Sequence, residues 1–274
     1  MENSIGIVIL NFNVYEETIK CVSSIRSVIE GSYQIVIVDN GSSNDSFEYL
    51  KAYFKEWMGI HVIKSKKNVG FAKGNNAGIR YLKDKYGVKF VFLLNSDTLF
   101  TDKDYFKKLI RKYQKGVGVI EANVLNGRGD FAQPGLEGIS VLACLHRFLR
   151  ALCKYFDIYW LFGEWKSKKK YLCQTGCAIM LTPDYFDVYQ GLYSYTFLYG
   201  EEHILLILLD RAGLRLEFVE DTYIIHKEGR STSSFMLEHS REKERRVLKG
   251  YWNVFLASCM PAGVLAKATR QKER

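Results

Sequence analysis

The residues of this sequence best suited to chemistry follow buried strands. The stretch "KFVFLLNSDTLF" contains five consecutive apolar residues, 90–94, and turns polar at Asn95, Ser96 and Asp97. Such side chains favour turns, because they form hydrogen bonds with their own backbone. They also suit a ligand site, because α/β proteins bind ligands just beyond the carboxyl ends of parallel strands. One strand end alone does not separate these two interpretations.

Two further predicted strands end in the same way. Asn11 and Asn13 follow the first apolar run of the chain, and Asp39 and Asn40 follow the second. The carboxyl ends of parallel strands lie along one edge of a sheet. Polar groups at three such ends therefore predict that Asp97 belongs to a ligand-binding site and not only to a turn.

Alternating strands and helices must position these ends. In the first half we expect strands at 5–13, 33–45, 60–68 and 89–94, and helices at 15–30, after a cap at Ser43 or Asn44, and at 70–87. In the second half we expect a helix at 141–163, a strand at 171–182, a helix ended by Gly213, and a strand that ends at His226. Strands that alternate with helices predict βαβ units and an α/β fold with a mostly parallel, Rossmann-like sheet.

The composition indicates a folded protein made of one large domain, with or without appendages. The chain has 274 residues, of which 47% are hydrophobic and only 3 are proline. No stretch reaches the roughly 18 charge-free apolar residues that span a bilayer, and the N-terminal segment reads as a strand and not as a signal peptide. The six cysteines form no zinc-binding pattern, because Cys173 and Cys177 lack a second pair of ligands. We therefore expect free buried thiols and a cytoplasmic protein.

The order and spacing of these segments resemble family 2 of the glycosyltransferases, which have the GT-A fold. The resemblance covers about residues 4–232 and is carried by "VILNFN", "IVIVDNGSSND", "NVGFAKGNNAGI", "FLLNSDT", "TGCAIMLTPDYFDVYQGLY", "YGEEHILLILLDRAG" and "IIHKEGRS". It implies an enzyme that transfers a sugar from a UDP- or dTDP-sugar. The block "NGRGDFAQPG" and the aromatic, basic segment after it resemble the rhamnosyltransferase-like branch, which builds bacterial surface polysaccharides and suggests dTDP-rhamnose as one donor.

The resemblance implies a metal ion at the donor site. Departure of a nucleoside diphosphate creates negative charge, which a divalent cation stabilises. Asn95, Ser96 and Asp97 stand where the family has its D-x-D motif, so Asp97 would be the principal acidic ligand of Mn²⁺ or Mg²⁺. His226 matches an additional metal ligand, and imidazole suits Mn²⁺ better than Mg²⁺. The alternative for His226 is a partly buried histidine bonded to backbone.

The resemblance also assigns the donor side of the site. Asp39 matches the aspartate that contacts the nucleoside, where a carboxylate can accept a hydrogen bond from the base or the ribose. The remaining donor-binding residues would be Asn11, Asn13, Asn68, Gly70, Lys73 and Asn76. Glycine lets the backbone approach a ligand, and the start of a helix favours phosphate.

An acidic pair supplies the expected catalytic base. Glu201 and Glu202 take the place of the family's Glu-Asp pair, whose second member deprotonates the acceptor hydroxyl in an inverting reaction. Glu202 would therefore be the base. Alternatively, both acids only complement a helix N-terminus. Ile204 stands where the family usually has a further aspartate, and this departure leaves a transferase without full activity as an alternative.

The expected organisation is a GT-A domain at 1–232 followed by a basic, amphipathic helical extension at 233–274. Within the domain, 1–126 would bind the nucleotide sugar and 127–232 the acceptor. The resemblance implies that this acceptor is a saccharide on a polyprenyl diphosphate at the inner face of the cell membrane. The oligomeric state, including a homo-oligomer, is left open by the sequence.

Two basic stretches predict peripheral contact with that membrane. Residues 141–170 and 241–274 combine basic and apolar residues at helical spacing, which suits a helix lying on an anionic surface. If these helices instead pack on the domain, their charges are merely solvated.

Three other classes of protein compete with this interpretation. A net charge of +9 would suit a nucleic-acid-binding protein, but such a protein leaves the acidic strand ends unexplained, and we expect no nucleic acid partner. A sugar-1-phosphate nucleotidyltransferase needs a glycine-rich basic loop after the first strand, where this chain has "NFNVYEET". A degenerate transferase would bind the donor without turnover.

Overall fold

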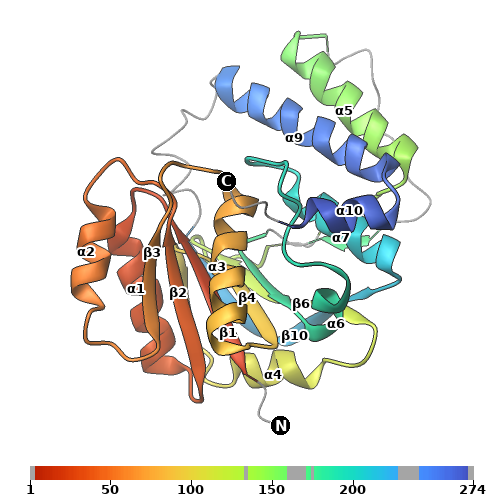
Figure 1. Ribbon diagram of the computed structural model, residues 1–274. Coiled ribbons are helices and arrows are strands. Elements are labelled where there is room, and N and C mark those ends of the chain that lie inside the picture. The colour runs from red at the N-terminus through yellow and green to blue at the C-terminus, as the bar shows by residue number, and fades with distance from the viewer. Residues whose placement is uncertain (1–3, 133–134, 159–170, 174–175, 228–240, 271–274) are drawn as a thin grey trace.

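An eight-stranded sheet forms the centre of the molecule. The computed structural model describes residues 4–132, 135–158, 171–173, 176–227 and 241–270. The strand order of the large sheet is β3-β2-β1-β4-β9-β6-β10-β5. Helices cover both faces of this sheet (Figure 1), and the α/β architecture predicted from the sequence is confirmed.

The first half of the chain forms the parallel part of the sheet. Its elements are β1 (Ile5–Asn11), α1 (Tyr15–Val28), β2 (Tyr33–Asp39), α2 (Ser46–Tyr53), β3 (Ile60–Lys64), α3 (Phe71–Tyr86) and β4 (Phe90–Asn95). Strand β1 pairs in parallel with both β2 and β4, and Asn11 lies opposite Asp39 while Leu10 lies opposite Asn95. The polar residues that follow these strands therefore share one edge, as predicted.

The second half adds the strands that complete the site. Its elements are β5 (Thr98–Leu99), α4 (Tyr105–Arg111), β6 (Val117–Asn126), β9 (Ala178–Leu181), α6 (Pro183–Val188), α7 (Glu201–Ala212) and β10 (Arg215–His226). Strand β9 runs antiparallel between β4 and β6, and β10 lies parallel to β6. Strand β5 pairs antiparallel with the end of β10, so that His226 lies opposite Thr98, next to Asp97.

Alternate side chains of the strands point to opposite faces and form two apolar layers. On one face, Ile7 and Phe92 pack with α1 and α4 in one cluster of buried residues. On the other face, Val8 and Leu93 pack with α3, α6 and α7 in a second cluster. Unlike a solvent-facing sheet, this one is covered on both sides, which explains the unbroken apolar runs of its central strands.

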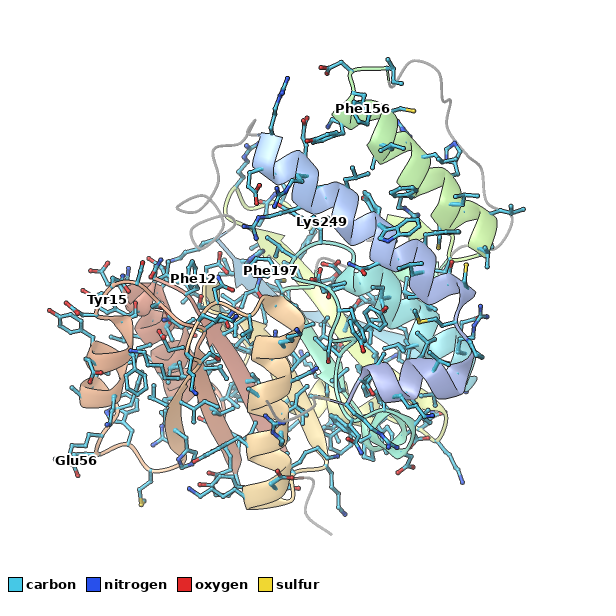
Figure 2. The ribbon with its side chains drawn as sticks, turned by 45° about the horizontal axis from the view of Figure 1, so that its top comes forward. Phe12, Tyr15, Glu56, Phe156, Phe197 and Lys249 are labelled. Carbon is cyan, nitrogen blue, oxygen red and sulfur yellow. The ribbon has the colours of Figure 1, made fainter. Side chains whose placement is uncertain are left out.

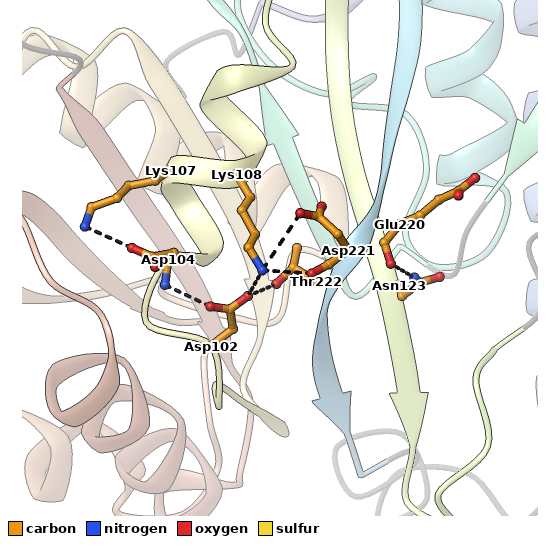
Figure 3. A network of polar contacts seen from close by, with 8 residues as sticks. All are labelled: Asp102, Asp104, Lys107, Lys108, Asn123, Glu220, Asp221 and Thr222. Carbon is orange, nitrogen blue, oxygen red and sulfur yellow. Dashed lines mark hydrogen bonds and ion pairs between the residues drawn. The ribbon is translucent and has the colours of Figure 1, made fainter.

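A polar network holds the middle of β10 in place (Figure 3). Pairing of β10 with β6 shifts register between Val219 and Tyr223, so the residues between them bulge. Lys108 Nζ donates hydrogen bonds to Asp102 Oδ2 and to the carbonyl oxygen of Asp221, each at 2.8 Å. Thr222 Oγ1 also donates to Asp102, at 2.6 Å. Lys108 thus satisfies one carbonyl oxygen of the bulge, and Asp102 ties the bulge to the loop before α4.

Outside the sheet lies a layer of helices. Its elements, with a small two-stranded sheet, are β7 (Gly135–Glu137), α5 (Val141–Tyr155), β8 (Tyr171–Cys173), α9 (Arg241–Cys259) and α10 (Ala262–Ala268). Figure 1 shows α5 and α9 lying side by side, with α10 and α7 beneath α9. Helix α9 buries Val254 and Ala257 in the core cluster that contains α7.

Three local expectations differ from the structure. The predicted strand 171–182 is two strands in different sheets, β8 and β9, and the helix predicted at 141–163 ends as a regular helix at Tyr155. Helix α2 has Asp45 at its N-cap position, and not Ser43 or Asn44. The boundary predicted at residue 232 and the basic segment 159–170 lie outside the described residues.

Four of the cysteines are buried with free thiols (Cys21, Cys144, Cys153 and Cys177), and the exposed Cys259 is also free. This agrees with the expectation of free thiols for the five. Within the described ranges, none of the helices combines the length and the apolar character needed to cross a membrane.

Candidate active site

Asp97 and His226 form the centre of the candidate metal site. His226 Nε2 lies 3.1 Å from Asp97 Oδ1, and the backbone N–H of Lys227 donates to the Asp97 carbonyl oxygen at 3.0 Å. Asp97 is only 3% exposed. Burial lowers the pKa of His226, but hydrogen bonds with Asp97 and Cys177 outweigh it and raise that pKa to about 10. The distance between the two side chains suits an ion pair whenever the His226 imidazole is protonated.

The same two side chains fit a shared divalent cation. Ligands bonded at about 2.1 Å and at right angles to each other lie about 3 Å apart, which matches the 3.1 Å between Asp97 Oδ1 and His226 Nε2. No group of three or more His, Cys, Asp and Glu side chains in the described ranges has metal-site geometry. A cation here would need ligands in addition to these two side chains.

The first two strand ends form a connected polar corner. Asp39 is fully buried, and its Oδ2 accepts a hydrogen bond from Asn11 Nδ2 at 2.8 Å. Its Oδ1 accepts from the backbone N–H of Ser42 at 3.0 Å. Gly41 between them has φ +73°, and a Cβ there would lie 2.3 Å from the backbone of Lys67. Glycine thus permits the turn that fixes the Asp39 carboxylate.

Asn13 closes this corner from the first strand. It has φ 61°, a left-handed conformation that asparagine adopts more readily than most residues. Its backbone N–H donates to Ser42 Oγ at 2.9 Å, and its Oδ1 accepts from the N–H of Ser43 at 2.9 Å. The predicted cluster of Asn11, Asn13 and Asp39 therefore exists as one hydrogen-bonded unit.

The loop before α3 is built around Asn40 and Asn68. Asn40 Nδ2 donates to Asn68 Oδ1 at 3.1 Å, and the N–H of Gly70 donates to the same Asn68 oxygen at 3.0 Å. Gly70 has φ +87°, and a Cβ there would lie 2.5 Å from the carbonyl oxygen of Phe197. Lys73 lies half-buried in the first turn of α3. Glycine at position 70 thus permits the close contact between this loop and the backbone of Phe197.

Asn76 is held differently from the other predicted donor residues. Its Nδ2 donates to the Leu192 carbonyl oxygen at 2.8 Å and to Ser194 Oγ at 3.2 Å, and its Oδ1 accepts from the Leu192 N–H at 2.7 Å. The side chain is 4% exposed. These contacts give Asn76 a structural task, which is to tie α3 to the segment that leads to α7.

The acidic pair opens α7 next to the metal corner. The helix starts after Tyr199 and Gly200, both with positive φ, at 76° and 89°. Glu202 Oε1 accepts a hydrogen bond from the Gly176 N–H at 3.3 Å. Glu201 Oε1 is buried without a hydrogen-bond partner. Burial, and then the negative charge of Glu202, raise the pKa of Glu201 to about 8.

A cavity of about 340 Å³ lies between the end of β10 and the acidic pair, and of the predicted donor-side residues only Asn95 lines it. Its polar lining includes Asn95, Glu201, Glu202 and His226. Ile204, which stands in place of the family's usual aspartate, is 1% exposed and packs in the core instead of facing this space. The sequence predicted Glu201, Glu202 and His226 of the cavity but missed His203 and the aromatic wall of Phe71, Tyr199 and Tyr251.

The central sheet, with helices on both faces and its polar strand ends along one edge, is the α/β architecture of the GT-A type. The family model for glycosyl transferase family 2 matches residues 6–161, more than half of the chain, and the chain belongs to this family. Its membership confirms the family part of the resemblance.

Two curated proteins are similar to a little under half of the chain. The low-salt glycan biosynthesis hexosyltransferase Agl10 of Haloferax volcanii is 31% identical over 133 residues, which cover 47% of this chain and 39% of the relative. The glycosyltransferase GlyG of Streptococcus pneumoniae is 23% identical over 126 residues, which cover 46% of this chain and 40% of the relative. The similarity therefore spans about two fifths of the length of each relative.

Solved structures extend the likeness of fold to nearly the whole chain. GalNAc-T7, crystallised with UDP, GalNAc and Mn²⁺, has a TM-score of 0.62 at 15% identity and covers 97% of this chain and 53% of its own. TarS 1–349 of S. aureus has a TM-score of 0.52 at 10% identity and covers 93% of this chain and 72% of its own. Both likenesses show the GT-A fold.

Proposed function

We propose that this protein is a metal-dependent, inverting glycosyltransferase that moves a hexose from a UDP- or dTDP-sugar to a hydroxyl group of a saccharide. One observation carries the proposal: Glu202 and His226 line the same cavity, and His226 is bonded to Asp97. A proton acceptor and a metal-binding corner therefore face one space. The name of the Haloferax relative, a hexosyltransferase, supports the class of sugar.

The donor half of the site suits a nucleoside diphosphate. The buried Asp39 carboxylate retains lone pairs beyond its two protein contacts and can accept a hydrogen bond from a base or a ribose. Lys73, in the first turn of α3, belongs to the segment that we assign to the phosphates. Asp97 and His226 would hold the divalent cation, which when bound neutralises the charge of the leaving diphosphate.

The acceptor half supplies one base. Glu201, with its pKa raised to about 8, is largely protonated at pH 7 and is suited to donate a hydrogen bond. Glu202 is therefore the member of the pair that takes the proton of the acceptor hydroxyl. The hydroxyl oxygen bonds to the anomeric carbon as the bond from that carbon to the diphosphate oxygen breaks, and the nucleoside diphosphate leaves with the electron pair. A single displacement of this kind inverts the anomeric configuration.

The biological setting we propose is cell-surface polysaccharide synthesis in the rhamnosyltransferase-like branch, with dTDP-rhamnose as one candidate donor. The acceptor would be a saccharide on a polyprenyl diphosphate, and the protein would work as a peripheral protein of the inner membrane face. This is supported by the outer helix α5, which leaves Leu142 63% and Phe156 62% exposed beside basic residues.

A thermal-shift screen tests the proposed function. A ligand that binds only the folded protein raises its stability by mass action. We expect UDP- or dTDP-hexoses to raise the melting temperature more with Mn²⁺ than with chelator, and the best donor to be transferred with inversion, as read by NMR of the product. Binding without transfer to any saccharide would favour the degenerate transferase. Absence of any shift would contradict the proposal.

A further inference from the structure

Helix α9 follows the predicted transferase domain in the sequence, yet it touches the turn that carries the acidic pair. Gly250 lies so close to this turn that a Cβ on it would sit 2.4 Å from the Tyr199 carbonyl oxygen. A Cβ on Gly200 would likewise sit 2.7 Å from Val254 Cγ2. The turn and the helix therefore meet backbone to backbone, through two glycines.

The contact continues along the helix. The guanidinium of Arg246 stacks over the ring of Phe197 at 4.5 Å, and Figure 2 shows Phe197 between α9 and the first turn of α3. On the other side of the turn, the Phe197 carbonyl oxygen accepts a hydrogen bond from the Phe71 N–H at 2.8 Å. Helix α9 and the donor-side helix α3 thus hold one turn between them.

This arrangement directs one side of α9 into the active-site cavity. Val247 and Tyr251, one helical turn apart, line the cavity together with Glu202. Tyr251 is half-buried, and its ring meets that of His203 edge to face at 5.9 Å. The next residue, Trp252, points elsewhere: it is 43% exposed and packs against Phe148 of α5.

We propose that Tyr251 is a specificity-determining residue, which binds the acceptor sugar by packing against its ring, and that α9 is the acceptor-side wall of the site. This inference rests on the proposed function. The carbon-bound hydrogens of a pyranose form an apolar face that packs on an aromatic ring, while its hydroxyls need polar partners. The cavity offers both, with an aromatic ring on α9 and the Glu202 carboxylate on α7.

Substitutions at Tyr251 separate this role from a structural one. Tyr251→Leu removes the flat ring but keeps apolar bulk, Tyr251→Phe keeps the ring, and Trp252→Ala removes a neighbouring aromatic residue outside the cavity. Each variant is assayed with the nucleotide sugar chosen by the thermal-shift screen and with p-nitrophenyl hexosides as acceptors. Donor KM and hydrolysis of the donor by water are measured alongside.

We expect Tyr251→Leu to raise the acceptor KM about fivefold to tenfold, the effect of losing one aromatic stacking contact. Tyr251→Phe and Trp252→Ala should keep the acceptor KM within about twofold of the wild-type value, and donor KM and hydrolysis should not change. An unchanged acceptor KM in Tyr251→Leu, or an equal rise in donor and acceptor KM, would overturn the inference. Failure of the wild-type protein to bind any nucleotide sugar would overturn the proposed function, and this inference with it.

Discussion

Glu201 and Glu202 are neighbours in one helical turn, yet the fold places their carboxyl groups in different environments. The Glu202 carboxylate accepts a backbone hydrogen bond from Gly176. Glu201 Oε1 is buried without a partner, and the pKa of Glu201 is raised to about 8 by burial and by its neighbour. A buried carboxyl group with a raised pKa, next to a carboxylate that accepts a backbone hydrogen bond, is a common arrangement for acid–base chemistry.

The first residue-scale prediction concerns the base. Glu202→Gln keeps the shape of the side chain but cannot take a proton, so transfer should fall by about 10²–10⁴, the usual contribution of a positioned general base. Donor affinity should remain, because Glu202 faces the acceptor side. Glu201→Gln is the matched control and should reduce transfer less. Transfer by Glu202→Gln at the wild-type rate would show that the pair is structural.

Glu201 should also make stability depend on pH. Its folded pKa of about 8 exceeds the ordinary value of 4.5, so the folded state holds a proton that the unfolded state loses above pH 4.5. Folding is therefore destabilised as pH rises from about 5 to 8. We expect Glu201→Gln to raise the melting temperature relative to wild type, with a difference that grows over this range. A difference that is constant with pH would contradict the raised pKa.

Asp97 can be tested through metal-dependent binding. Asp97→Asn keeps a hydrogen-bond acceptor next to His226 but removes the negative charge. The part of the donor-induced thermal shift that requires Mn²⁺ should disappear, while the metal-free part remains. Asp39→Asn serves as the comparison, because we propose that this residue binds the nucleoside, so that its loss should weaken both parts. An Mn²⁺-dependent shift of wild-type size in Asp97→Asn would exclude this residue from the metal site.

At the scale of elements, the first half of the chain was predictable because its signals are local. Buried parallel strands read as unbroken apolar runs, and Gly41 and Gly70 mark turns that need positive φ. The second half was less predictable, because the insertion of β9 between β4 and β6 depends on pairing between distant segments. The left-handed conformation of Tyr199 has no sequence signal, since it is held by packing.

One residue of α9 indicated in the sequence that this helix packs closely against another segment. Gly250 lies inside a 19-residue helix, where glycine is less stable than alanine by about 1 kcal/mol. A glycine in such a position indicates a close approach of another segment, here the backbone of Tyr199. The basic and apolar spacing of 241–274 predicted a helix on an anionic membrane, with packing on the domain as the alternative. Which partner each surface of the helix meets is decided by tertiary packing, and α9 packs against the turn at Tyr199.

The bulge of β10 gives a prediction at this scale. Lys108 and Thr222 hydrogen bonds lower the pKa of Asp102 below 3.8, against the effect of partial burial. The lowered pKa stabilises the fold above pH 3.8, and this contribution is lost as pH falls through the folded pKa. Asp102→Asn should therefore lower the free energy of unfolding by about 1 kcal/mol at pH 7, measured by urea unfolding, and by less near pH 3.

Asp104 provides the control for Asp102. It lies in the same loop and pairs with Lys107 at 3.0 Å, but its side chain is 41% exposed, against 22% for Asp102. Exposed ion pairs contribute little, because water and salt screen them. Asp104→Asn should leave the unfolding curve unchanged. Equal effects of the two substitutions would mean that the network does not stabilise the bulge beyond an ordinary surface ion pair.

At the scale of the whole molecule, the outer helices α5 and α9 each pack one side on the rest of the protein and expose the other side to solvent. Helix α9 turns Val254 and Ala257 into the core and Tyr251 toward the cavity. Helix α5 is strongly amphipathic, yet only Ala143, Cys144 and Cys153 are buried among its residues. The inner side of α9 therefore packs on the domain, as the alternative to membrane contact expected. Helix α5 keeps an apolar and basic surface that fits an anionic bilayer.

This surface leads to the last prediction. The protein should sediment with phosphatidylglycerol vesicles at low ionic strength and be released at high salt, since screening weakens its attraction to anionic lipid. Arg150→Glu with Lys154→Glu reverses two exposed charges on α5 and should abolish sedimentation. The control is Lys51→Glu with Lys55→Glu, which makes the same charge change at two exposed positions, also four residues apart, near the end of α2. Figure 2 shows the neighbouring Glu56 far from Phe156, which follows α5. This control should still sediment. Equal loss of sedimentation in both double variants would mean that overall charge, and not the α5 surface, binds the vesicles. If the wild-type protein does not sediment, α5 has no membrane role.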